Sequence, residues 1–142
     1  MEPAFWDSSA LVPICLQQRV STTVKQLSNR YDVVAWWATP VEARSAFARE
    51  LRAGTLSLSE YQQALEKFAV IRDGWHEIQP AEELRQIAES MLERYKLRGA
   101  DALQLAAAYV WSGGRPFERH FISCDRQLLD AAREAGFRVI EA

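Results

Sequence analysis

The sequence has little of several features that would assign it to a common protein class. Only two of its 142 residues are cysteines, Cys15 and Cys124, and they show no metal-ligand spacing. Because disulfides are rare in reducing compartments, we interpret both as small core residues of a cytoplasmic protein. No apolar run approaches the roughly 18 residues that a spanning helix needs, and no positively charged start precedes an apolar stretch. We expect neither membrane insertion nor export.

An excess of positive charge is also missing. The chain has 17 Lys and Arg against 19 Asp and Glu, which gives a net charge of -2. Because phosphate neutralisation supplies most non-specific affinity for nucleic acids, this balance argues against a broad basic RNA-binding surface. It leaves open an enzyme that holds metal ions with carboxylates, since bound metal restores positive charge locally.

Several catalytic signatures are missing as well. There is no glycine-rich phosphate loop and no Asp-x-Asp nucleophile motif, so other α/β phosphoesterases have no support. His76 and His120 have no Ser, Cys or carboxylate partner at a recognisable spacing. A ribonuclease that works by acid-base catalysis with two histidines is therefore disfavoured.

The order of periodic segments predicts an α/β fold. No linker or repeat divides the chain, so we expect one domain over residues 1–142. Strands are predicted at Ala4–Trp6, Val33–Trp37, His120–Cys124 and Phe137–Ile140, with one more possible at Trp75–Ile78. Helices are predicted at Ser9–Leu16, Thr22–Arg30, Pro40–Arg52, Ser59–Arg72, Ala81–Arg94, Asp101–Trp111 and Arg126–Glu134. Such alternation implies a mostly parallel sheet covered on both faces.

Local signals support some of these boundaries. Thr39 to Glu42 and Ser59 to Gln62 each have the pattern of a capping box at a helix start. Gly54 and Gly136 follow helical segments, where a left-handed residue commonly ends a helix.

Four acidic residues stand at the junctions of strands and helices. Asp7 and Asp125 each follow a predicted strand, and Glu42 and Asp101 each lie at the start of a helix. In a parallel sheet these positions meet at the carboxyl edge, where open α/β sheets bind their ligands. Converging carboxylates repel one another unless some are protonated or a cation lies between them. A hard divalent cation such as Mg²⁺ suits such oxygen ligands.

Each acid also has a purely structural interpretation. Asp7 and Asp125 are good N-caps for the helices that follow them, Asp101 lies in a first turn where acids are favoured, and Glu42 fits a capping box. Position alone does not choose between caps and metal ligands.

Sequence motifs that span nearly the whole chain resemble those of PIN domains. The most specific is the segment from Leu97 to Ala108, in which Asp101 precedes Ala-Leu and a helix of small apolar residues. In the expected order, Asp7 is followed by Ser-Ser-Ala-Leu, Thr-Pro precedes Glu42, and Ser-Cys precedes Asp125. Ser123 stands where such proteins often carry Thr, and it keeps the hydroxyl. The chain is most similar to VapC-like toxins, small free-standing PIN proteins.

This resemblance implies a fold, a reaction and partners. The fold would be a PIN-like three-layer α/β/α arrangement around four to five strands. The reaction would be hydrolysis of RNA with Mg²⁺, or Mn²⁺, bound by Asp7, Glu42, Asp101 and Asp125; Asp7 and Asp101 are expected as direct ligands. The partners would be RNA, a cognate antitoxin protein and a second copy of the chain.

Four further residues are expected to assist the acids. The hydroxyls of Ser9 and Ser123 are candidates for orienting the ligating carboxylates. Arg98 and Arg126 are candidates for binding RNA phosphates, because each is close to a proposed ligand in sequence. Two other functions stay open: a PIN nuclease of RNA maturation or decay, and a catalytically silent PIN module that binds RNA or a protein.

Overall fold

Five parallel strands form the central sheet of the computed structural model, which describes residues 1–16 and 21–142. The strand order is β3-β2-β1-β4-β5. The strands are β1 (Glu2–Trp6), β2 (Tyr31–Trp36), β3 (His76–Ile78), β4 (His120–Ser123) and β5 (Arg138–Glu141). The predicted parallel sheet is confirmed, and its fifth strand is the short one proposed around residues 75–78.

Helices connect these strands and follow the predicted order. They are α1 (Ser8–Cys15), α2 (Thr22–Arg30), α3 (Thr39–Arg52), α4 (Leu58–Asp73), α5 (Glu82–Arg94), α6 (Gly99–Trp111) and α7 (Arg126–Ala135), and a short 3₁₀ turn covers Pro116–Glu118. The bounds of α2 are those predicted, and the other helices differ from prediction by at most two residues at either end. Within the described ranges, none of the helices combines the length and the apolar character needed to cross a membrane.

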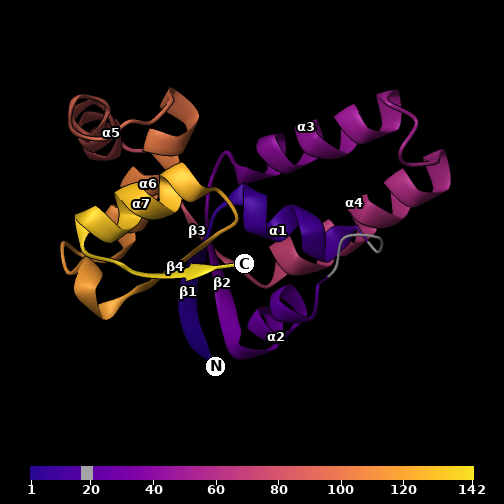
Figure 1. The fold of residues 1–142 in the computed structure, drawn as a ribbon, viewed down its shortest axis with the longest axis horizontal. Helices are drawn as coiled ribbons and strands as arrows, with labels where there is room; N and C mark the ends of the chain where they lie inside the picture. The colour runs from indigo at the N-terminus through magenta and orange to yellow at the C-terminus, as the bar shows by residue number, and fades with distance from the viewer. Residues whose placement is uncertain (17–20) are drawn as a thin grey trace.

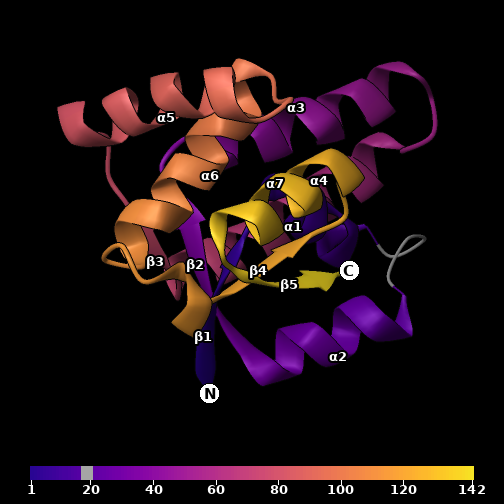
Figure 2. The same ribbon diagram turned by 60° about the vertical axis from the view of Figure 1, so that its left-hand side comes forward.

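The helices cover both faces of the sheet and make three layers. Side chains alternate along β1: Phe5 packs into a cluster with residues of α5, α6 and α7, whereas Ala4 and Trp6 pack with residues of α1. Figures 1 and 2 show the strands between α5, α6 and α7 on one side and α1, α2 and α4 on the other. A further cluster joins α1, α3 and α4, with Phe47 fully buried in it. The three-layer α/β/α fold is confirmed.

Both predicted capping boxes need correction. Helix α3 begins one residue earlier than predicted, with Ala38 as N-cap and no side-chain cap, so Thr39 lies inside the helix. The box at the start of α4 is formed by Ser57 with Glu60, not by Ser59 with Gln62. The two glycine predictions are confirmed, because Gly54 and Gly136 have φ angles of 78° and 109°.

The two cysteines differ in environment. Cys15 is buried at the end of α1, as predicted. The prediction that Cys124 is a core residue is wrong: the residue is exposed. Strand β4 ends at Ser123, one residue earlier than expected, so Cys124 lies in the turn that leaves the sheet.

Candidate functional site

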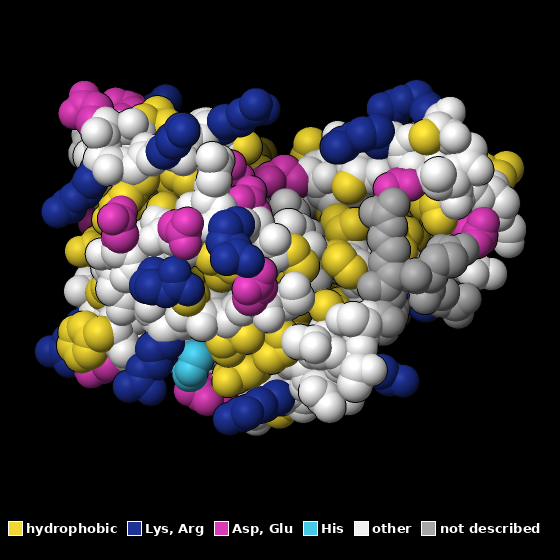
Figure 3. Space-filling view, viewed as in Figure 1, with side chains coloured by type: hydrophobic (Ala, Val, Ile, Leu, Met, Phe, Trp, Pro, Cys, Tyr) yellow, Lys and Arg dark blue, Asp and Glu magenta, His cyan; other side chains and the backbone are white. Residues whose placement is uncertain are grey.

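The four predicted acids all lie at the carboxyl edge of the sheet. Asp7 directly follows β1, and Asp125 lies two residues beyond β4, its neighbour in the sheet. Glu42 and Asp101 lie in the first turns of α3 and α6. In Figure 3 acidic side chains gather in a hollow between two lobes, and both upper rims of the hollow carry Lys and Arg side chains.

Asp7 is the most buried of the four acids. Its side chain is 3% exposed and accepts hydrogen bonds from the hydroxyls of Ser9 (2.7 Å) and Ser123 (3.0 Å) and from the backbone N–H of Ala10 (3.3 Å). Burial raises the pKa of Asp7 to about 7; the hydrogen bonds lower it and the nearby Asp125 raises it. The predicted contacts of Ser9 and Ser123 with a site carboxylate are therefore present.

Glu42 is held by two residues that the sequence analysis did not single out. Its carboxylate accepts hydrogen bonds from the hydroxyl of Ser8 (3.1 Å) and from the side-chain amide of Gln104 (3.0 Å). The same amide lies 3.2 Å from the hydroxyl of Thr39. Gln104 is buried in α6, three residues after Asp101, so the two lie on neighbouring parts of one helix face. A single long polar residue among Ala and Leu was the signal that could have revealed it.

Repulsion between like charges links Asp101 and Asp125 to the other two acids. The pKa of Asp101 is raised, first by burial and then by Asp125, whereas Arg98 lowers it. The pKa of Glu42 is raised by burial and, more weakly, by Asp101, while its two hydrogen bonds lower it. Asp125 therefore repels both Asp7 and Asp101, and Asp101 repels Glu42. Four segments far apart in sequence bring their negative charges within range of one another.

Two of the acids also serve as helix caps. Asp7 caps α1, and the carboxylate of Asp125 accepts from the backbone N–H groups of Gln127 (2.9 Å) and Leu128 (3.2 Å) at the start of α7. Across residues 1–16 and 21–142, no three His, Cys, Asp or Glu side chains are placed so that they could hold a metal ion together. Any ion here would thus have at most two of these carboxylates as ligands in the arrangement observed.

Arg98 and Arg126 have different environments. Arg98 is exposed at the N-cap of α6, and its charge acts on Asp101. Arg126 begins α7 and forms an exposed ion pair with Glu141, with 3.2 Å between the nitrogen and oxygen atoms. Of the two, Arg98 is therefore the one whose charge bears on a site carboxylate.

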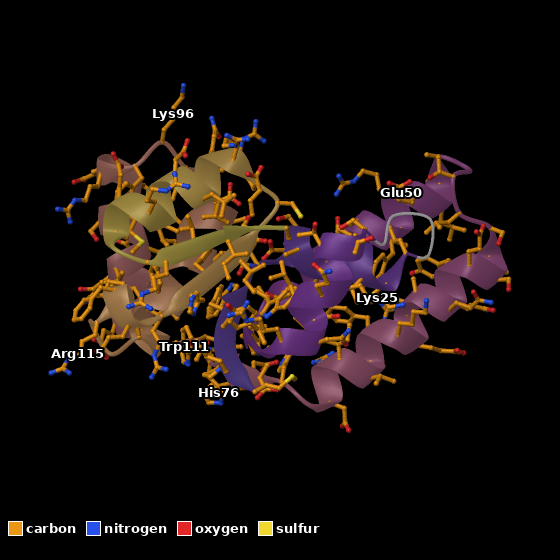
Figure 4. The ribbon with its side chains drawn as sticks, turned by 60° about the horizontal axis from the view of Figure 1, so that its bottom comes forward. Lys25, Glu50, His76, Lys96, Trp111 and Arg115 are labelled. Carbon is orange, nitrogen blue, oxygen red and sulfur yellow. The ribbon has the colours of Figure 1, made fainter. Side chains whose placement is uncertain are left out.

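Both histidines lie away from the acids. His76 and His120 are the first residues of β3 and β4, whereas the acids follow the carboxyl ends of strands. In Figure 4 Lys96, in the turn before α6, extends from the top of the molecule, while His76 is at the opposite, lower side. The sequence predicted no catalytic role for either histidine, and neither lies at the edge of the sheet that carries the four acids.

Comparison with known proteins connects this geometry to a fold. The sequence matches no protein family and no curated protein. Three solved structures are similar over nearly the whole chain. A toxin-antitoxin complex from Klebsiella pneumoniae matches with a TM-score of 0.66 and 16% identity, over 96% of this chain and 95% of that one. FitAcB from Neisseria gonorrhoeae matches with a TM-score of 0.66 and 14% identity, over 97% and 96%.

The third structure is PAE2754 from Pyrobaculum aerophilum, with a TM-score of 0.64 and 21% identity over 97% of this chain and 83% of that one. At these identities the likeness concerns the fold. The PIN-like fold class expected from the sequence is confirmed.

Proposed function

We propose that the protein is a metal-dependent endoribonuclease and the toxin of a toxin-antitoxin pair. The observation that carries the proposal is the convergence of Asp7, Glu42, Asp101 and Asp125 at one sheet edge, where a neighbouring acid raises the pKa of three of them. None of these acids forms an ion pair with Lys or Arg among the described residues. A divalent cation would offset the repulsion that the protein's own charges leave in place.

The donor atoms fit Mg²⁺ or Mn²⁺. The carboxylates are accompanied by the hydroxyls of Ser8, Ser9 and Ser123, so the buried part of the site offers oxygen donors. Mg²⁺ usually takes one or two carboxylates and completes its shell with water and substrate phosphate. The absence of a group of three ligands among the described residues is thus compatible with Mg²⁺, whereas a closed structural zinc site needs four protein ligands.

The chain's own residues would hold the ion, orient the ligands and bind the substrate. Bound Mg²⁺ or Mn²⁺ supplies an activated water and polarises the scissile phosphate. We assign Asp7 and Asp101 as direct ligands, with Glu42 and Asp125 acting through waters or a second ion. Ser9 and Ser123 fix the two carboxylate oxygens of Asp7.

Substrate binding would draw on the two arginines. Arg98 stands next to the acids with its guanidinium exposed, where an RNA phosphate could reach it. Arg126 could exchange Glu141 for a phosphate at small cost, because exposed ion pairs contribute about 0–1 kcal/mol.

The toxin assignment is supported by the fold shared with a protein of the Klebsiella pneumoniae toxin-antitoxin complex. By that analogy the partners would be RNA as substrate and an antitoxin protein as inhibitor. A homodimer stays a prediction, to be checked by light scattering of the purified protein.

A catalytically silent module is the rival function, and the caps formed by Asp7 and Asp125 favour it. The environment of Asp7 argues against caps alone. Asn or Ser caps a helix as well as Asp does, without placing a charge in a buried position. Because burial raises the pKa of Asp7, the charged form is disfavoured at this position, which supports a role beyond capping.

Cleavage of RNA by wild-type protein and by Asp101→Asn tests the proposal. With Mg²⁺ or Mn²⁺, wild type should cut single-stranded RNA, and Asp101→Asn should lose at least about a hundredfold in rate, because outer partners of metal ligands already contribute 10- to 100-fold. Glu118→Gln, at the amino edge, is the matched control and should cut normally. If Asp101→Asn cuts RNA at the wild-type rate, the mechanism is wrong.

A further inference from the structure

A cavity of about 430 Å³ opens at the same edge of the sheet as the acids, beyond the ends of β2 and β3. Its apolar walls come from Trp36, Pro80, Ala81, Leu84 and Leu103, and Glu82 and Arg85 add polar groups. The volume lies within the roughly 300–1,000 Å³ typical of small-ligand pockets. The proposed metal ligands take no part in its walls.

Two short connections lead from the cavity wall to Glu42. Trp36 ends β2, and the chain then leads within six residues to Glu42. On the other side, Leu103 adjoins Gln104, whose side-chain amide donates to Glu42. A polymer bound across the acids would therefore have its neighbouring unit within reach of the cavity.

An exposed aromatic ring stands next to this cavity. Trp37 is 52% exposed, while its backbone N–H is fixed by a 3.1 Å hydrogen bond to the carbonyl of Ile78. Its ring packs edge-on against Trp36, a wall residue, with 6.3 Å between ring centroids. The ring is held from one side and leaves much of its surface open to solvent.

One wall residue also carries an unsatisfied donor. The indole N–H of Trp36 is buried and has no hydrogen-bond partner in the described part of the chain. A buried donor without a partner is unfavourable for folding, so packing alone does not explain this N–H.

We infer that the cavity and Trp37 form a nucleobase-binding site for an unpaired base of the RNA. The inference rests on the proposed function and extends it from the cleaved phosphate to a neighbouring base. Flat heteroaromatic rings stack on exposed indoles, and their edges carry acceptors and donors that suit the exposed polar groups of Glu82 and Arg85. Glu82 and Arg85 form an exposed ion pair with each other, which the polar edge of a base could join and an aliphatic side chain from a protein partner could not.

Fluorescence of RNA oligonucleotides with 2-aminopurine at successive positions tests this site. Binding is followed in Ca²⁺, and abasic oligonucleotides report what the base contributes. At one position wild type should quench the fluorescence and bind the intact RNA about tenfold more tightly than the abasic RNA, which is within the range for one stacked base.

Variants separate stacking from general effects on the protein. Trp37→Ala should bind about tenfold more weakly, and Trp37→Phe should restore most of the affinity. Ala81→Trp, at an exposed position with an extended backbone, should fill the cavity and abolish the preference for the intact base. Phe117→Ala removes a similarly exposed aromatic (58%) outside this cavity and should bind as wild type does. Thermal denaturation checks that each variant is folded.

The outcomes distinguish this inference from the proposed function. Equal binding of intact and abasic RNA at every position, or wild-type affinity in both Trp37→Ala and Ala81→Trp, would overturn the base site. RNA cleavage by wild type in Mg²⁺ or Mn²⁺, measured in parallel, reports on the nuclease separately. Base-dependent binding without any cleavage would retain the site and reject the nuclease.

Discussion

The four acids at the carboxyl edge of the sheet differ from the arginines at its amino edge in the partners they have. At the amino edge, arginine side chains have partners: Arg30 lies over the ring of Tyr31, Arg119 over Trp111, and Arg138 donates to the carbonyl of Phe117. At the carboxyl edge, Asp7, Glu42 and Asp101 have hydrogen bonds or nearby charges but no ion pair with Lys or Arg among the described residues.

The difference distinguishes charged side chains that stabilise the fold from carboxylates that do not. Folding alone favours pairing or removing buried charges, because a buried carboxylate without a cation opposes folding at neutral pH. Asp7 opposes this preference, because the residue is only 3% exposed and its carboxyl group has no cationic partner among the described residues. Such residues, which oppose the local requirements of the fold, are expected at functional sites.

The largest expected difference between the edges is in the pH dependence of stability. The pKa of Asp7 is about 7 in the folded protein against 3.8 for an ordinary Asp, so the folded state binds more protons between these values. Stability should therefore fall as pH rises from about 4 to about 7, by up to roughly 4 kcal/mol. Asp7→Asn should remove this fall and be the more stable protein at pH 8. Urea denaturation across this pH range measures it.

The matched control for this comparison is Glu118→Gln, an exposed acid near the amino edge. Its pH profile should run parallel to that of wild type. Parallel profiles for Asp7→Asn and wild type would instead show that folding does not raise the pKa of Asp7.

Mn²⁺ should stabilise the folded protein through the carboxyl edge alone. Mn²⁺ at about a hundred times its dissociation constant should raise the free energy of unfolding by about 2.7 kcal/mol, provided that it binds the folded state alone. Thermal denaturation with and without Mn²⁺ measures the shift. Asp101→Asn should lose most of it, and Glu118→Gln should keep it. No shift at millimolar Mn²⁺ would favour the silent module.

Much of the fold could be predicted because it depends on local patterns. The bounds of α2 and the left-handed glycines Gly54 and Gly136 follow from periodicity and helix-end chemistry. The box at Ser57 and Glu60 was also readable, since Ser-x-x-Glu stands in the sequence. Cys124 was misplaced because strand ends are set by pairing with neighbours, which one segment does not reveal.

The sequence predicted where the four acids lie, but not which side chains contact them. Strand-helix junctions and the PIN resemblance located the four carboxylates at one edge. The sequence from Thr39 to Glu42 is the same whether the Glu42 carboxylate bonds to the backbone at the start of its own helix or to another element. In the structure it accepts hydrogen bonds from Ser8 and Gln104, which lie on other helices. Such a contact joins residues 62 positions apart and leaves no periodic signal.

The smallest expected effect concerns one hydroxyl within the carboxyl edge. Ser123 is fully buried; its hydroxyl donates to Asp7 and accepts the backbone N–H of Asp125 (2.9 Å). Because its hydrogen bond lowers the pKa of Asp7, Ser123→Ala should raise that pKa further, so protons compete better with metal at neutral pH. Mn²⁺ affinity at pH 7 should fall about tenfold, and less at pH 9, where Asp7 is ionised in both proteins. Calorimetric titration at the two pH values measures this, and an equal loss at both would mean that Ser123 acts through packing and not through the charge of Asp7.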